Sequence, residues 1–170
     1  MTYSPDSCAC FTGHRAMSND EMKRVSLLIS KEVTELYNRG IYNYYAGGAL
    51  GFDFAASVTV LNLKAILPKL TLNLALPCRE YMKKWTSSQI ALFERVIERA
   101  DCVTYVSEEY SRGCMQERNK YMVDRSNVCI AYLKERHGGT FNTVSYAKKK
   151  GVKVINMAGG LYADQICLDL

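Results

Sequence analysis

The chain has 170 residues, of which 48% are hydrophobic and 23% charged, and its formal net charge is +5 at pH 7. This length and balance fit one globular domain and argue against intrinsic disorder. No apolar run approaches the roughly 18 residues of a membrane span, and no secretory signal pattern opens the chain. We therefore expect one cytoplasmic domain over residues 1–170, without a membrane partner.

The net charge suits an anionic small ligand, but it is too modest to indicate a nucleic-acid partner by itself. The seven cysteines lie mostly in apolar runs, where cysteine behaves as a small hydrophobic residue. None of them forms a C-x-x-C pair, so the spacing does not predict a structural zinc site. We expect reduced thiols, no metal site and no bound cofactor.

Short apolar runs alternate with longer helical patterns along the chain. In chain order the pattern predicts a strand at 8–11, a helix at 18–39, a strand at 41–46, a helix from 51 to about 66, a strand at 70–76, a helix at 87–99, a strand at 101–106, a helix at 115–125, a strand at 128–133, a helix at 142–150 and a strand at 152–156. Ser18 and Glu21 have the spacing of a capping box at the start of the first helix.

This alternation indicates a Rossmann-like, doubly wound α/β fold, with a mainly parallel sheet and helices on both faces in three layers. In such folds ligands bind beyond the carboxyl ends of the strands, where the strand order reverses. The site is therefore expected in a small set of loops. These are residues 12–15, 47–53, 77–85, 107–118 and 134–140.

The sharpest local signal is the strand-to-helix turn that carries Gly47, Gly48 and Gly51, followed by Asp53. Glycines let the backbone approach a ligand closely, and the free N–H groups of a helix start favour an anion. The turn matches neither the G-x-G-x-x-G fingerprint nor a Walker A loop. Asp53 is available to ribose hydroxyls; alternatively, the segment is a tight turn in which Asp53 caps the helix.

A second glycine pair, Gly138-Gly139, precedes Thr140 and Thr143 at the start of the last helix. Two glycine-rich helix starts at the ends of two strands would be able to flank one nucleotide. The alternative is a flexible connection with a threonine cap.

Basic and aromatic side chains in the same loops are further candidates. Arg118, near a helix start, is suited to grip a phosphate with two hydrogen bonds, and Arg15 is a second phosphate candidate. His14 is either a general acid or base or a hydrogen-bonded loop residue. Trp85 and Tyr81 would stack on a base or pack as core or lid residues.

Taken together, four segments resemble the SLOG superfamily of Rossmann-like proteins, which includes the Lonely Guy phosphoribohydrolases and the DprA-type DNA-processing proteins. The resemblance is greatest to its YpsA-like branch of bacterial and phage proteins. The segments are Phe11-Thr12-Gly13-His14-Arg15, the turn at 47–53, Arg118-Asn119-Lys120-Tyr121-Met122-Val123-Asp124, and 138–140 with Thr143, Tyr146 and Ala147.

The resemblance implies a pocket for a nucleotide-type ligand, built by the two glycine turns. With the loop candidates named above, the residues predicted to bind the ligand are Gly13, His14, Arg15, Gly47, Gly48, Gly51, Asp53, Trp85, Arg118, Asn119, Asp124, Gly138, Gly139, Thr140 and Thr143.

Lonely Guy enzymes carry Met-x-x-Arg-Lys-x-x-Met, then Ser-Asp, then Pro-Gly-Gly-x-Gly-Thr-x-x-Glu. This chain matches the first part with Met115, Arg118 and Met122, and we interpret the two methionines as core side chains. The catalytic glutamate is missing, because positions 144–146 read Val, Ser and Tyr. Cleavage of an N-glycosidic bond requires an anionic group beside the ribose.

Three functions follow as hypotheses. The first is a protein that senses or sequesters a nucleotide-derived ligand, such as an ADP-ribose or cyclic-nucleotide species, without Lonely Guy-type catalysis. The second is an N-glycoside hydrolase in which Asp53, Glu117 or Asp124 replaces the glutamate. The third is DprA-like binding of single-stranded DNA, which would weaken steeply with salt. A homodimer is a common state of such folds, and the tail at 158–170 is either a packing helix or a partner contact.

Overall fold

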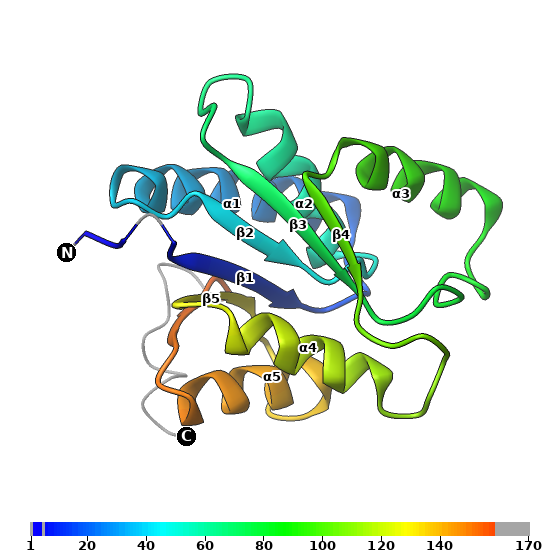
Figure 1. Ribbon diagram of the computed structural model, residues 1–170. Coiled ribbons are helices and arrows are strands. Elements are labelled where there is room, and N and C mark those ends of the chain that lie inside the picture. Colours follow the sequence, from blue (N-terminus) through cyan, green and yellow to red (C-terminus); the bar gives the residue numbers. More distant parts are fainter. Residues whose placement is uncertain (1, 5, 159–170) are drawn as a thin grey trace.

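The computed structural model describes residues 2–4 and 6–158 (Figure 1), so the tail expected to pack or to contact a partner lies outside the described residues from 159 onward. In chain order the elements are β1 (Cys8–Gly13), α1 (Asn19–Asn38), β2 (Asn43–Ala46), α2 (Phe52–Leu63), β3 (Thr71–Leu76), α3 (Ser87–Arg99), β4 (Cys102–Tyr105), α4 (Cys114–Asp124), β5 (Val128–Tyr132), α5 (Gly138–Lys149) and β6 (Lys153–Asn156). Every predicted element is present.

In the described part of the chain the strands form one parallel sheet of six, in the order β4-β3-β2-β1-β5-β6. The chain builds outward from β1 to β4, returns to place β5 on the other side of β1, and continues outward to β6. The order therefore reverses between β1 and β5, where a doubly wound sheet opens its ligand crevice. This arrangement confirms the Rossmann-like prediction.

The helices cover both faces of the sheet, as Figure 1 shows, with α1, α2 and α3 on one face and α4 and α5 on the other. Strand side chains alternate between these faces. On β1, Ala9 and Phe11 belong to the core cluster under α1–α3, whereas Cys10 packs with Cys129 of β5 and Met122 of α4 on the opposite face. Both faces are buried, so the strands are apolar on both sides.

The starts of two helices are specified by capping boxes. At α1 the Ser18 hydroxyl accepts from the Glu21 N–H, and the Ser18 N–H donates to the Glu21 carboxylate, both at 3.2 Å. At α3, Thr86 and Gln89 make the same reciprocal pair. The box predicted for the first helix is confirmed.

The start of α5 differs most from the prediction, since the helix begins at Gly138 rather than at residue 142. Glycine has low helix propensity, so helical periodicity becomes visible only after the glycine pair. The first turn of a helix lacks partners for its N–H groups in any case. The glycine pair is thus the first turn of α5 and not a loop before it.

Two loops at the carboxyl edge of the sheet pack directly on each other. Gly51, the residue that precedes α2, has a φ of +75°, and the Phe52 N–H donates to the His14 carbonyl at 3.1 Å. A Cβ atom at Gly51 would lie 2.3 Å from the Arg15 carbonyl oxygen. Glycine is therefore required here both for its backbone conformation and for the close approach.

We expect Gly51→Ala to lower the free energy of unfolding by about 2 kcal/mol or more, because it adds backbone strain to a clash with a main-chain carbonyl. Gly113→Ala is the matched control: Gly113 has a φ of −100°, and its added Cβ would meet nothing within 4 Å. The control should change stability by no more than about 1 kcal/mol. Urea unfolding curves measure both, and equal losses would contradict this account of the loop junction.

Candidate functional site

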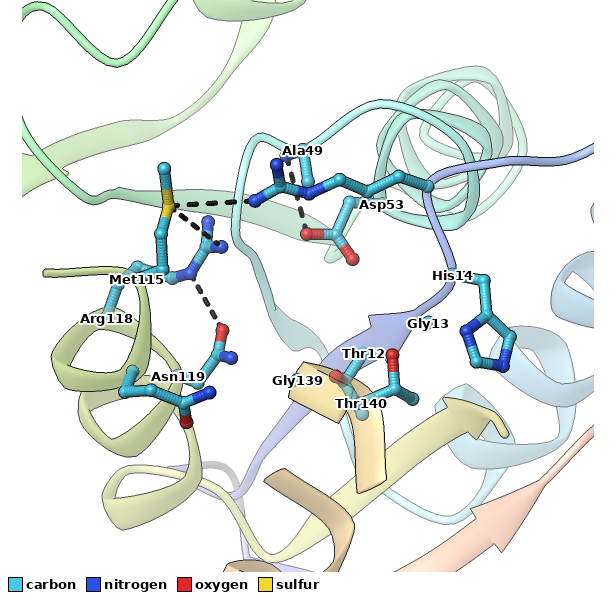
Figure 2. A pocket seen from close by; sticks show the side chains of 12 residues that line it. Thr12, Gly13, His14, Ala49, Asp53, Met115, Arg118, Asn119, Gly139 and Thr140 are labelled. Atoms are coloured by element: carbon cyan, nitrogen blue, oxygen red, sulfur yellow. Dashed lines mark hydrogen bonds between the residues drawn. The ribbon is translucent and has the colours of Figure 1, made fainter. Parts of the chain in front are cut away.

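A cavity of about 240 Å³ opens at the carboxyl edge of the sheet, where α2, α4 and α5 begin around the end of β1 (Figure 2). The residues that line it and that the sequence predicted as ligand-binding are Gly13, His14, Arg15, Asp53, Arg118, Asn119, Gly139 and Thr140. The lining residues that it did not predict as ligand-binding are Thr12, Ala49, Met115 and Gln116.

Asp53 lies in the first turn of α2 and is only 5% exposed. Its Oδ2 accepts from the Ala49 N–H at 3.5 Å. Burial raises the pKa of the Asp53 carboxyl above its ordinary value, although the Arg118 guanidinium acts in the opposite direction. The N-cap of α2 is Gly51, so the alternative in which Asp53 caps the helix is wrong.

Arg118, in the second turn of α4, is only 4% exposed. Its Nε donates to the Asn119 Oδ1 at 2.9 Å, and its Nη2 lies 4.0 Å from the Met115 sulfur. Its Nη1 is buried and has no hydrogen-bond partner among the described residues. Burial lowers the pKa of the guanidinium, yet arginine stays protonated in proteins. An unpaired N–H of a buried cation is costly, so the guanidinium would gain stability from a further hydrogen-bond acceptor.

Gly47 allows the guanidinium and the carboxyl to approach the same turn. A Cβ atom at this position would lie 2.4 Å from Nη1 of Arg118 and 2.8 Å from Oδ2 of Asp53. A side chain here would therefore displace one of the two charged groups. The glycine of the turn is needed for the pocket wall itself, a role that the sequence pattern alone does not distinguish from ligand contact.

Arg15 and Met115 form the outer wall of the pocket. Arg15 is exposed, and its Nη2 lies 3.7 Å from the sulfur of Met115, as a dashed line in Figure 2 marks. The interpretation of Met115 as a core side chain is wrong, because it is half-buried and lines the pocket. Its thioether is a soft, weak acceptor that can face two guanidinium groups without an ion pair. Met122, about two turns further along α4, is in the core as predicted.

His14 is a hydrogen-bonded loop residue. Its Nε2 accepts from the Lys134 N–H at 3.0 Å, and its ring stands edge-on to Tyr132, with ring centroids 6.4 Å apart. Figure 2 shows the imidazole on the far side of the pocket from Arg118. The geometry thus agrees with the second of the two interpretations of His14, a side chain that joins the loops after β1 and β5.

The start of α5 lines the pocket and lacks a side-chain cap. His137 precedes the helix, and its side chain makes no capping hydrogen bond. Gly139 and Thr140 line the cavity, and the hydroxyl of Thr143 donates to the Gly139 carbonyl at 2.8 Å within the helix. Uncapped N–H groups at a helix start, together with the positive end of the helix dipole, attract anions.

Trp85 does not line the main cavity. It packs edge-on against Tyr81 and Phe93, with ring centroids 5.5 and 5.7 Å away. With Tyr81 and Arg118 it borders a separate void of about 20 Å³. The Tyr81 hydroxyl is buried there and, within the described residues, has no hydrogen-bond partner. Gly48, with a φ of +73°, leaves room for this hydroxyl, which would lie 2.9 Å from an added Cβ.

Asp124 and Glu117 are not brought to the pocket. Asp124, at the end of α4, accepts from the Tyr146 hydroxyl at 2.9 Å and pairs with Lys150 at 3.1 Å. Glu117 is exposed and accepts from the Ser107 hydroxyl at 3.2 Å. Of the three acids considered as substitutes for a catalytic glutamate, Asp53 alone lines the cavity in the described part of the chain.

Residues 2–4 and 6–158 include no helix with the length and apolar character needed to cross a membrane. The same residues contain no group of three or more His, Cys, Asp or Glu side chains that would hold a metal ion.

The fold and its pocket define a Rossmann-like protein whose cavity lies at the switch point of the sheet. Residues 9–157 match the YpsA family model, described as the YspA SLOG family, and the chain belongs to this family. The resemblance to the SLOG superfamily and its YpsA-like branch is thereby confirmed. The protein is 32% identical over 146 residues to the SPbeta prophage-derived protein YoqJ of Bacillus subtilis, covering 78% of this chain and 85% of YoqJ.

Other relatives are more distant. A UPF0398 protein of Macrococcus caseolyticus is 24% identical over 119 residues, which cover 69% of this chain and 64% of that protein. The DprA structures of Streptococcus pneumoniae and Helicobacter pylori align with TM-scores of 0.67 and 0.64, each at 17% identity, and cover 95% and 92% of this chain. The protein spans 54% of the first DprA chain and 67% of the second, and the likeness shows the shared fold.

The loop after β5 is held to α1 by a charged contact. Glu21 accepts hydrogen bonds from the Lys134 ammonium and, at 3.1 Å, from the Tyr132 hydroxyl. The hydrogen bond from Lys134, with that from the Ser18 N–H, lowers the pKa of Glu21 from 4.5 to about 2. The contact thus fixes the residue whose N–H group binds His14.

This pKa predicts a stability window in acid. A carboxyl group with a lowered pKa in the folded state contributes stability that is present above about pH 4.5 and is lost as the pH falls through about 2. Glu21→Gln should therefore lose less stability between pH 4.5 and 2 than the wild type does. Glu35→Gln, on the exposed side of the same helix, is the control and should follow the wild type. Thermal unfolding across this range tests the point, and parallel curves for wild type and Glu21→Gln would refute it.

Proposed function

We propose that this protein binds a phosphate-bearing small ligand of nucleotide type in the cavity between β1, α2, α4 and α5. The observation that carries the proposal is the buried guanidinium of Arg118, a residue that lines the cavity and whose Nη1 has no hydrogen-bond partner in the described part of the chain. A phosphate oxygen would complete its hydrogen bonding and offset the burial of its charge. Membership of the SLOG superfamily supports a nucleotide as the source of that phosphate.

The electrostatics of the cavity also favour an anion. Arg118 and Arg15 supply two positive charges, and the uncapped start of α5 adds the positive end of a helix dipole. Asp53 is the only carboxylate among the lining residues of the described chain, and burial raises its pKa. The cavity therefore remains positive whether Asp53 is ionised or not.

Three oxygen-bearing side chains are placed to contact a sugar next to that phosphate. Asp53, Thr12 and Thr140 line the same cavity, and all three are less than a tenth exposed. Carboxyl and hydroxyl groups can accept or donate hydrogen bonds to ribose hydroxyls. We assign Asp53 and the two threonines to the sugar, and Arg118, Arg15 and the start of α5 to the phosphate.

The position of the missing catalytic glutamate supports binding without Lonely Guy-type hydrolysis. On α5, residues 144–146 are Val, Ser and Tyr, and Val144 is buried in the small core beneath the helix. No second carboxyl group lines the cavity in the described residues to work with Asp53. The cavity can therefore surround a ligand, but only one carboxyl group among the described residues lines it.

Hydrolysis by Asp53 alone is a second candidate function. A carboxyl group whose pKa is raised by burial is suited to act as a general acid toward a leaving base. A third candidate is single-stranded DNA binding, because the structure of the Helicobacter pylori DprA neighbour is described as showing a binding mode for single-stranded DNA. A small phosphate ligand supplies a partner for the unpaired Nη1 at least as well as the ligands of these two functions would. The unpaired atom therefore favours neither of them over the first proposal.

We expect Arg118→Met to weaken the binding of AMP and of ribose 5-phosphate at least tenfold, since it removes a charged hydrogen bond worth about 1.5–3 kcal/mol. Isothermal titration calorimetry measures both affinities. Arg125→Met is the matched control, because Arg125 is exposed at the end of α4 and stacks on Tyr121 with its Cζ atom 3.6 Å from the ring centroid. Equal affinities for wild type and Arg118→Met would reject the phosphate site.

A second experiment separates binding from hydrolysis. We expect AMP to remain intact during prolonged incubation with the protein, as followed by chromatography of free adenine, because the cavity lacks a second carboxyl group. Release of adenine that Asp53→Asn abolishes would establish the hydrolase in place of the binding protein. Asp124→Asn serves as the control, since Asp124 pairs with Lys150 outside the cavity.

A further inference from the structure

A second cavity, a groove of about 460 Å³ between α4 and α5, lies next to the proposed phosphate pocket, because Gln116 and Asn119 line both. The other residues that line the groove are Lys120, Phe141, Asn142, Thr143, Ser145, Tyr146 and Lys149. The pocket alone is smaller than most small-molecule sites, which measure about 300–1,000 Å³, whereas the pocket and groove together fall within that range. The two neighbouring cavities together therefore offer room for a ligand longer than one phosphate and sugar.

The groove is positively charged. Lys120 and Lys149 are exposed on its two walls, and its lining within the described residues includes no carboxylate. The nearby carboxylate of Asp124 is already engaged by the Tyr146 hydroxyl and by Lys150. An anion in the groove would meet two cations without a competing acid.

Polar and aromatic groups of the groove suit a nucleoside. Asn119 uses its Oδ1 for Arg118, which leaves its NH₂ group to donate where the pocket and groove meet. Phe141 and Tyr146 are half-buried on α5 and line the groove, and the ammonium groups of Lys120 and Lys150 lie near the Tyr146 ring. Aromatic side chains of this kind form stacking platforms for bases of any identity.

The positive charges of the groove lie further along α5 than the start of that helix. The Lys120 ammonium lies 5.6 Å from the centroid of the Tyr146 ring. Tyr146 is seven residues beyond Gly139 on α5, which corresponds to a rise of roughly 10 Å along the helix. A phosphate at the start of α5 and an anion near Lys120 would therefore lie at different levels along α5, which suits a ligand with two separated negative groups.

We propose that the groove is a second phosphate subsite and that the ligand class is a linear dinucleotide. Its first phosphate binds at Arg118 and the start of α5, its nucleoside lies against Asn119 and Phe141, and its second phosphate lies near Lys120 and Lys149. This inference rests on the proposed function of the adjoining pocket. It extends that function from a single phosphate and sugar to a ligand with two separated negative groups.

The test compares AMP with the 5′-phosphorylated dinucleotide pApA by isothermal titration calorimetry on the full chain. The wild type should bind pApA at least about tenfold more tightly than AMP. The double variant Lys120→Ala/Lys149→Ala should bring the two affinities within about threefold of each other and leave AMP binding unchanged. The control Lys84→Ala/Lys153→Ala removes the same charge from exposed lysines outside both cavities and should keep the preference.

The outcomes separate this inference from the function on which it rests. If AMP binds but pApA binds no more tightly, or if the groove variant keeps the preference, the second subsite is rejected while the phosphate pocket stands. If neither ligand binds at millimolar concentration, both proposals fail. If a 5′-phosphorylated 20-nucleotide single strand binds far more tightly than pApA, with a steep loss of affinity in salt, the partner is nucleic acid and the dinucleotide assignment is overturned.

Discussion

The site depends on the burial of Arg118 and Asp53 against the same glycine turn. Each side chain is nearly inaccessible, and neither fully offsets the cost of burying the charge of the other. Burial raises the pKa of the Asp53 carboxyl, and the Arg118 guanidinium keeps an N–H group without a partner among the described residues. Such a pair contributes little to stability when it is incompletely satisfied. Because Gly47 has no side chain, both groups can approach the same turn, and both residues line the cavity. The fold therefore retains an arrangement that a bound anion would complete.

Much of the architecture was predictable because the alternation of apolar strands and amphipathic helices is a strong, repeated signal. The parallel sheet and the three layers follow from it, and the spacing of Ser18 and Glu21 separately predicted the capping box. The start of α5 was not predictable in this way, because Gly138 and Gly139 carry no apolar periodicity. Apolar periodicity reveals a helix by the side chains of its buried face. A first turn that begins with two glycines has no such side chains and so gives no signal.

The sequence predicted the position of some site residues correctly and of others wrongly, and each difference has a physical cause. Loop position at the carboxyl edge correctly brought Arg15, Asp53 and Arg118 to one cavity, because parallel strands end at the same edge. Met115 was misjudged, since apolar character alone does not tell whether a thioether faces the core or two guanidinium groups. Asp124 lies two turns beyond Arg118, at the opposite end of α4. The family motif thus extends along α4, and Arg118 lines the cavity while Asp124 does not.

The helix starts around the cavity have a consequence for engineering. The residues before α2, α4 and α5 are Gly51, Gly113 and His137, and none makes a side-chain capping hydrogen bond, whereas α1 and α3 begin with complete boxes. Serine or aspartate at Gly113 or His137 would be an ordinary choice for a more heat-resistant variant. The new side chain would occupy the same N–H groups that face the cavity. Thermostability gained at these two helix starts would come at the expense of anion binding in the cavity, whereas the capping boxes of α1 and α3 lie outside the cavity lining and carry no such conflict.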